Sequence, residues 1–368
     1  MRAGAGLSRK GDVRDAAREA VQQALDSAGL SQADCLLLAA TAQHLDEAID
    51  LCEVLREVAG AGVRIVGGCA SQVFLPGDEQ EDGPALGVLA IEGPAHPFVF
   101  KPGDSASLAE AAQAAGPSPL CLVFADPSAA VPRLVQALAR EAPGAQVAGG
   151  GVVAEGGLVL DDDLVEAAAV GLFLPGPARV GVAQGHQPVG KRLLVTAADG
   201  RMIRELDGRA AVELLAALEA EPGMQDLSSA LPFLALAAAP APGEEFKDDD
   251  FVTLPLLGVD EDTGGLAVGG PISEGTQVTF ALRDGMGARR ATERMLETLA
   301  TQGKPQLGVY FDCSSRGSAL YGIEGLDLSL IKKSLGSFPL LGLRTSFELG
   351  PAGASVGLHV YTGILGLI

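Results

Sequence analysis

The densest cluster of polar side chains in the sequence follows an apolar run near the C-terminal end. The segment YFDCSSRGSALYG (310–322) places a carboxylate, a thiol, two hydroxyls and a guanidinium on five consecutive residues. Residues 307–311 are typical of a buried strand, and ligand sites of α/β sheets lie just beyond the carboxyl ends of strands. The segment could therefore hold a nucleophile, bind a small ligand, or form a polar turn that closes the fold.

Cys313 is the candidate nucleophile of this segment. A cysteine attacks as its thiolate and needs a neighbouring base to remove the proton. His359 is the histidine of the C-terminal region that could serve as this base, but sequence alone does not bring the two together. The chain also contains no HExxH and no Walker A pattern. We therefore expect that the protein is not an enzyme and keep a Cys313-dependent activity as an alternative.

Arg316 suits a different role. Its planar guanidinium matches a carboxylate or phosphate group through two parallel hydrogen bonds. The alternative is an internal ion pair with an acid of the chain such as Glu348. The residue types leave both interpretations open.

A second candidate site follows another strand, in the segment QGHQP (184–188). A single histidine in such a turn is usually held by hydrogen bonds, but His186 could also bind a metal or the iron of a haem. We expect no metal and no cofactor, with haem bound by His186 or His359 as the alternative.

The chain that must position these residues is globular and strongly acidic. Of its 368 residues, 48% are hydrophobic and 20% charged, which is typical of a folded protein with a large core. The formal net charge of −21 disfavours nucleic acids and anionic membrane surfaces as partners, because both repel an acidic surface. The acids gather in short runs beside glycine or proline, which predicts solvated loops.

The five cysteines indicate a reducing, intracellular compartment. Their number is odd and no pair has CxxC spacing, so neither a disulfide framework nor a zinc site is expected. Cys35, Cys52 and Cys121 fall on apolar strand or helix faces and are predicted to be buried and unpaired. The first ten residues lack the apolar core of a signal peptide, and no apolar run is long enough to span a bilayer. These features predict a cytoplasmic protein.

A unit of strand, helix and strand ending in glycine occurs three times along the chain. The predicted elements are 35–40, 45–55 and 63–66 in the first occurrence, 120–124, 131–139 and 146–148 in the second, and 307–311, 326–335 and 338–341 in the third. Recurring supersecondary units suggest duplication. The alternation of strands and helices predicts an α/β fold with two related domains, mixed sheets and flanking helices.

A hairpin marks the change between the second and third occurrences. Two strand-like runs at 191–196 and 202–206 flank Asp199-Gly200, a dipeptide that favours a two-residue hairpin turn. Proline and glycine punctuate the chain heavily after this point. We therefore expect a domain boundary at or just after the hairpin.

Taken together, motifs along the chain resemble those of the FIST proteins, a family named for F-box and intracellular signal transduction. The matching segments are GCAS (68–71), AQGHQPVG (183–190), VT (195–196), LDG (206–208), CSSRG (313–317), FELGP (347–351) and LHVYT (358–362). The match runs from about Asp34 to the C-terminus in the order of the family. Because the whole series agrees, it is more specific than any single motif.

The resemblance implies a FIST N-terminal domain over 1–205 and a FIST C-terminal domain over 206–368. Such a protein is an intracellular sensory module that binds a small polar ligand, such as an amino acid. It would report to a separate signalling protein such as a histidine kinase. Some bacterial members resemble haem-based nitric-oxide sensors, which keeps haem as the alternative, and a scaffold without ligand is a further one. The implied ligand-binding residues are Cys313, Ser314, Arg316, Gly317, Glu348, His359, Gln184 and His186.

The resemblance also suggests how an amino acid would be held. Arg316 would pair with its carboxylate and Glu348 with its ammonium group. The alternative is that these two side chains pair with each other and lock the C-terminal sheet. The sequence departs from the family at Phe347, which replaces a glycine, and at Thr345 and His186, where cysteines are usual. These changes alter the expected shape of the pocket.

Overall fold

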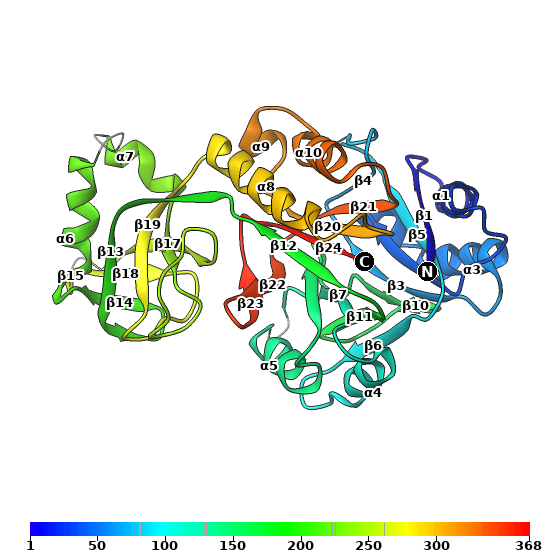
Figure 1. The fold of residues 1–368 in the computed structure, drawn as a ribbon, viewed down its shortest axis with the longest axis horizontal. Helices are drawn as coiled ribbons and strands as arrows, with labels where there is room; N and C mark the ends of the chain where they lie inside the picture. Colours follow the sequence, from blue (N-terminus) through cyan, green and yellow to red (C-terminus); the bar gives the residue numbers. More distant parts are fainter. Residues whose placement is uncertain (81, 129–130, 222–223, 225, 261) are drawn as a thin grey trace. The chain divides into compact units, whose positions relative to one another are not determined.

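A computed structural model describes the chain except for residues 81, 129–130, 222–223, 225 and 261. The described residues form two compact units. Figure 1 labels the helices and strands of both. Unit 1 comprises residues 1–183, 292–351 and 362–368, and unit 2 comprises residues 184–291 and 352–361. A single cut between 205 and 206 does not reproduce these units. The reason is that the chain leaves unit 1 at residue 184 and later returns to complete it.

Unit 1 contains all three of the predicted strand–helix–strand repeats. They are β2 (Cys35–Ala40), α3 (Ala48–Ala59) and β3 (Arg64–Cys69); β7 (Leu120–Ala125), α5 (Val131–Glu141) and β8 (Gln146–Gly151); and β20 (Gly308–Cys313), α10 (Leu326–Leu335) and β21 (Leu340–Thr345). In each repeat the two strands are parallel neighbours. The strands around Cys35, Cys121 and Val309 therefore lie in sheets and lead to helices, as predicted.

An antiparallel strand beside each parallel pair makes all three sheets mixed. These strands are β5 (Leu86–Glu92), β11 (Ala169–Leu174) and β24 (Gly363–Leu367). The sheets run β1 (Arg2–Ser8)-β5-β2-β3-β9 (Leu158–Leu160)-β10 (Asp163–Leu164); β23 (Ser355–His359)-β22 (Glu348–Ala352)-β8-β7-β11-β6 (His96–Phe100); and β12 (Arg179–Ala183)-β24-β20-β21-β4 (Gln72–Phe74). The fold is thus α/β, with parallel and antiparallel neighbours in each sheet.

The three repeats complete one another's sheets in a cycle. Strand β4 follows the first repeat but pairs with β21 of the third, and β22 follows the third but pairs with β8 of the second. Strand β9 follows the second repeat and pairs with β3 of the first. The repeats also share a buried core, since the ring centroids of Phe124 in β7 and Phe311 in β20 lie 5.6 Å apart. No single repeat therefore has all the strands of its own sheet.

Residues at both ends of helix α1 (Val13–Ala28) in unit 1 cap it. The helix begins after Asp12, whose carboxylate accepts a hydrogen bond from Asp15 N. It ends at Gly29, which takes the left-handed conformation with φ of 63°. Helices α2 (Ala42–Leu45), α4 (Ala106–Ala115) and α9 (Ser318–Tyr321) also lie here, while α8 (Gly285–Ala300) crosses from unit 2 into unit 1 at Thr292.

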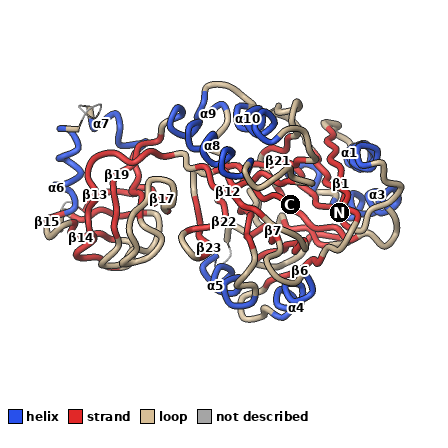
Figure 2. Tube along the Cα trace, viewed as in Figure 1, coloured by secondary structure: helices blue, strands red, loops and turns tan. Residues whose placement is uncertain are grey.

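Unit 2 is built on an antiparallel sheet, whose strands are drawn in red in Figure 2. The order is β13 (His186–Asp199), β19 (Gln277–Arg283), β16 (Leu234–Ala238), β17 (Val252–Asp260), β18 (Gly265–Val268), β14 (Met202–Leu206) and β15 (Arg209–Ala210). Strand β13 also pairs with β14, which closes the sheet into a ring and confirms the hairpin predicted around Asp199-Gly200. The strand β23 (Ser355–His359), the short helices α6 (Ala211–Ala216) and α7 (Leu227–Ala230), and the 3₁₀ turns at Ala217–Ala220 and Leu231–Phe233 complete this unit.

All five cysteines are buried, and Cys35, Cys52 and Cys121 are unpaired, as predicted. Burial raises the pKa of the Cys35 thiol to about 12, so this group stays protonated and inert at neutral pH. Among the described residues, no helix is both long and apolar enough to cross a membrane.

Candidate functional site

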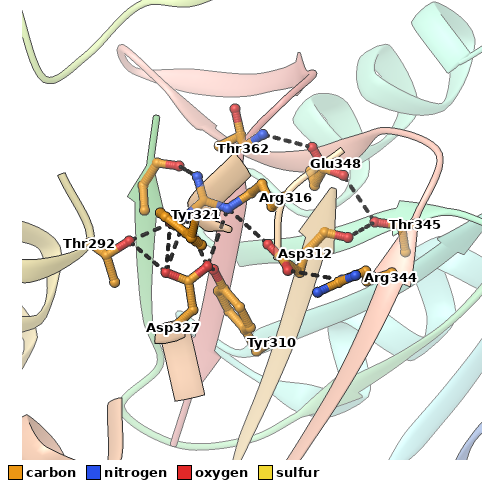
Figure 3. A network of polar contacts seen from close by, with 11 residues as sticks. Thr292, Tyr310, Asp312, Arg316, Tyr321, Asp327, Arg344, Thr345, Glu348 and Thr362 are labelled. Carbon is orange, nitrogen blue, oxygen red and sulfur yellow. Dashed lines mark hydrogen bonds and ion pairs between the residues drawn. The ribbon is translucent and has the colours of Figure 1, made fainter. Parts of the chain in front are cut away.

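Strand β20 delivers the polar segment to the edge of its sheet. Because side chains alternate along a strand, Tyr310 and Asp312 share one face. The chain then turns, with Arg316 N donating a hydrogen bond to Cys313 O at 2.8 Å. Gly317 has φ of 63° and precedes α9, so the turn suits a residue without Cβ. This turn directs the Arg316 side chain into the protein (Figure 3).

Arg316 is the centre of a buried polar network. Its Nη2 lies 3.0 Å from Asp327 Oδ2, and its Nη1 donates to Ala183 O at 3.2 Å. Its Nε lies 2.9 Å from Asp312 Oδ1. The side chain is 0% exposed, and those of Asp312 and Asp327 are 4% and 7% exposed. Burial alone would lower the pKa of Arg316, but Asp327, two tyrosines and Asp312 raise it, so the guanidinium is firmly charged.

Asp327 is held by hydroxyl groups as well as by Arg316. Tyr310 donates to its Oδ2 at 3.0 Å, and Tyr321 and Thr292 each donate to its Oδ1 at 3.0 Å. Buried carboxylates are costly unless such donors replace water. Both oxygens of the Asp327 carboxylate accept hydrogen bonds. Four side chains from different parts of the chain therefore fix its orientation.

A second part of the network lies around Glu348. Its Oε1 accepts a hydrogen bond from Thr345 Oγ1 at 3.0 Å, and its Oε2 accepts one from Thr362 N at 3.3 Å. The guanidinium of Arg344 lies 3.5 Å from Asp312 Oδ2. Burial first and then Asp312 raise the pKa of Glu348 well above its ordinary value. Burial also raises the pKa of Asp312, to about 7, against the pull of Arg316.

Glu348 makes the stability of the protein depend on pH. Its pKa is higher in the folded state than in the unfolded chain, so its contribution to stability is complete below the ordinary value of 4.5. That contribution is lost as pH rises through the folded-state pKa. We expect the wild type to lose more free energy of unfolding between about pH 5 and about pH 9 than Glu348→Gln does. Urea unfolding at both pH values measures the difference, and equal losses would contradict it.

A small cavity lies against this network. Its volume is about 20 Å³, and its polar lining comes from Glu79, Tyr310, Asp312, Tyr321, Asp327 and Arg344. Such a volume holds one group of the size of water or ammonium. Asp312 Oδ1 receives no hydrogen bond from any described residue, despite its closeness to Arg316 Nε. The cavity is therefore lined by two buried carboxylates, and Asp312 Oδ1 is ion-paired with Arg316 without a hydrogen bond from a described residue.

The structure places five of the predicted site residues in unit 1. Gly317 lines the cavity, whereas Arg316 lies behind its lining with its donors directed to protein acceptors. The acids that pair with Arg316 are Asp312 and Asp327, so the internal ion pair exists with partners other than the expected Glu348. Cys313 is buried, and Ser314 is exposed. Glu348 is buried and bonded within the network.

The other three predicted residues belong to unit 2. The side chain of Gln184 donates to Phe251 O at 2.8 Å, and His359 is 1% exposed. His186 is 2% exposed, and its ring centroid lies 4.9 Å from that of Tyr361. Burial and then Arg283 lower the pKa of His186 to about 4, so its imidazole is neutral. Among the residues the structure describes, no group of three or more His, Cys, Asp or Glu could hold a metal ion.

A Gly-Ala-Ser-Val-Gly pentapeptide at 353–357 has the GxSxG spacing of hydrolase nucleophiles. In those enzymes the serine lies in a sharp turn between a strand and a helix. Here Ser355 begins the strand β23 and is exposed. The pentapeptide is therefore part of a hairpin rather than a nucleophile elbow.

The acid that matters most to Arg316 was missed by the sequence analysis. Asp327 lies on the apolar side of α10, one turn before the buried Leu330 and Ile331. Thr292 lies on the apolar side of α8, one helical turn from each of the buried residues Ala288 and Leu296. A polar residue at an apolar position of an amphipathic helix was the available signal for both.

Two models of known domains match this chain. The model of the FIST N domain matches residues 10–209, and that of the FIST C domain matches residues 189–351. This chain belongs to the FIST family. An uncharacterised protein of Mycobacterium tuberculosis is 31% identical over 100% of this chain and 99% of its own length. An uncharacterised protein of Mycobacterium bovis is 30% identical over 100% of this chain and 98% of its own length.

FIST domains are sensory domains of signal transduction, and both halves of the pair are present here. The two matched segments overlap at 189–209, around the boundary expected at 205. Most of the Arg316 network lies in the FIST C segment, whereas Glu79 of the cavity lining lies in the FIST N segment. Both family domains therefore contribute to the cavity within unit 1.

Proposed function

We propose that this FIST protein is a cytoplasmic sensory module that binds a small polar ligand in the cavity beside Asp312 and Asp327. The observation that carries the proposal is a cavity that fits one ammonium-sized group and is lined by the buried carboxylates of Asp312 and Asp327. An ammonium group there would donate a hydrogen bond to the carboxylates of the lining and offset part of their negative charge. Ligand binding would be reported to a separate signalling protein, such as a histidine kinase.

The geometry favours a ligand held by its cationic group, as in an amino acid. Asp312 would receive the ammonium group, in place of Glu348, because Glu348 already bonds Thr345 and Thr362. Arg316 would not hold the ligand carboxylate, since its donors go to Asp327, Ala183 and hydroxyl groups. Arg316 acts as a positioning residue that holds the two aspartates against the cavity.

Two experiments test the proposal. Mass spectrometry of whatever co-purifies with the native protein identifies the ligand, and calorimetric titration with methylammonium probes the cavity directly. Asp312→Asn is expected to weaken methylammonium binding by at least about tenfold, because a buried charge-assisted contact is lost. The matched control is Asp126→Asn, a buried aspartate that follows β7 and bonds Ser128 and Gly156. Equal affinity in the wild type and Asp312→Asn would contradict the assignment.

A further inference from the structure

Most of unit 2 is an insertion into the third repeat of unit 1. In the first two repeats a strand at the edge of the sheet leads through a short loop into a helix: residues 9–12 join β1 to α1, and residues 101–105 join β6 to α4. In the third repeat β12 has the same edge position and α8 is the helix, but residues 184–284 lie between them. The rest of unit 2, residues 352–361, comes from the same repeat.

The third repeat keeps the packing of edge strand and helix despite the insertion. A Cβ on Gly6 of β1 would meet Ala20 O of α1, and a Cβ on Gly181 of β12 would meet the side chain of Met295 in α8. In the first two repeats the short loop limits how far the strand end can lie from the helix, since one residue spans at most about 3.5 Å. The insertion removes this limit, because the fold of unit 2 sets the distance between its own ends. Noncovalent contacts must therefore replace the short loop.

Arg316 makes these contacts at both ends of the insertion. Its Nη1 donates at 3.2 Å to the carbonyl oxygen of Ala183, the last residue of unit 1 before the insertion. Its Nη2 donates at 3.2 Å to Oγ1 of Thr292, the first residue of unit 1 after the insertion. Thr292 Oγ1 in turn donates to Asp327 Oδ1 at 3.0 Å. One buried guanidinium therefore bonds both residues at which the chain leaves and re-enters unit 1.

The return of the chain at Thr362 is bonded to the same network (Figure 3). Thr362 N donates to Glu348 Oε2 at 3.3 Å, and Thr362 O accepts a hydrogen bond from Cys313 N at 3.1 Å. Cys313 O accepts the hydrogen bond from Arg316 N that forms the turn after β20. All of these groups belong to unit 1. The network thus gathers three of the points at which unit 1 continues into unit 2.

We propose that Arg316, Thr292, Asp327 and the carbonyl group of Ala183 form a clasp that fastens the ends of the inserted unit 2. Asp312 and Asp327 hold the guanidinium of the clasp, and both line the small cavity. A change of charge at the cavity therefore acts on the side chain that holds the ends of the insertion. Resting on the proposed function, this link is the route by which occupancy of the cavity reaches unit 2. The clasp itself requires no ligand.

Amide hydrogen exchange of the segments 181–186 and 286–294 tests the clasp. Thr292→Val removes the hydroxyl group and is expected to speed exchange in both segments about fivefold, the factor that corresponds to one hydrogen bond. Thr292→Ser keeps the hydroxyl group and should exchange at nearly the rate of the wild type. The matched control is Thr41→Val, which removes a buried hydroxyl group that bonds Ala85 after β2 of the first repeat. This control should leave both segments unchanged.

Asp312→Asn tests the link between the clasp and the cavity. The side chain of Asp312 pairs with Arg316 and Arg344, neither of which adjoins unit 2. The variant should nevertheless speed exchange in both segments about threefold or more, because Arg316 loses one of its two carboxylate partners. Unchanged exchange in β2 would verify that unit 1 remains folded in each variant.

The outcomes separate the clasp, the link and the proposed function. Equal exchange in the wild type and Thr292→Val, or equally fast exchange in Thr292→Val and Thr292→Ser, would overturn the clasp. Faster exchange in Thr292→Val but not in Asp312→Asn would support the clasp and overturn its link to the cavity. None of these results depends on methylammonium binding, so the clasp can fail while the proposed function stands, and the proposed function can fail while the clasp stands.

Discussion

Replacing Arg316 by methionine is expected to destabilise the protein by about 3–5 kcal/mol, because two buried carboxylates lose their common counter-ion. Asp312 and Asp327 lie 2.9 and 3.0 Å from the guanidinium and are almost fully buried. Neither can recover its lost partner from water. The effect should therefore exceed that of any exposed ion pair of this chain.

Urea unfolding of Arg316→Met and of a control variant measures this effect. Arg64→Met is a suitable control, since Arg64 forms two 2.8 Å hydrogen bonds with Asp161 on the surface. Exposed pairs contribute about 0–1 kcal/mol, so this variant should unfold close to the wild type. Adding Asp327→Asn to Arg316→Met should restore part of the loss, because it removes one unpaired charge. A loss below about 1 kcal/mol for Arg316→Met would show that the network does not depend on its guanidinium.

A fragment of residues 1–209 is expected not to fold into a monomer, although it spans the FIST N match. The fragment keeps β4 and β8 but loses β21 and β22, the strands with which they pair. It also loses core residues such as Phe311, which packs against Phe124. Unpaired strand edges beside exposed apolar surface promote aggregation. Size-exclusion chromatography and amide hydrogen exchange should show aggregated or unprotected material.

The fragment of residues 184–291 provides the comparison. It contains all seven strands of the closed antiparallel sheet and the apolar cluster beneath it. We therefore expect protected backbone amides and a cooperative unfolding transition from this fragment. If residues 1–209 instead gave a monomer with cooperative unfolding, the exchange of strands between repeats would not be needed for stability.

Local patterns determined most of the secondary structure. Apolar runs ending in glycine predicted the strands of the three repeats, because buried strands need continuous apolar residues and the glycines allow close approach. In each repeat a bulky residue of the first strand is paired with a glycine of the second, as at Leu38 and Gly67, Val123 and Gly149, and Tyr310 and Gly342. The burial of Cys35, Cys52 and Cys121 followed from the same patterns. These features depend on neighbours in the sequence, so they could be predicted without the fold.

The tertiary structure decided which groups meet. Strand β4 has only three residues, and its pairing with β21 joins segments about 270 positions apart, which no local pattern encodes. The sequence likewise showed Arg316 and its chemistry, but it did not show whether Glu348 or Asp327 would be its partner. Ion pairs form through space, and helix α10 turns Asp327 toward Arg316 while Thr345 and Thr362 hold Glu348. Glu79 reached the cavity for the same reason, because the fold places its loop at the start of α10.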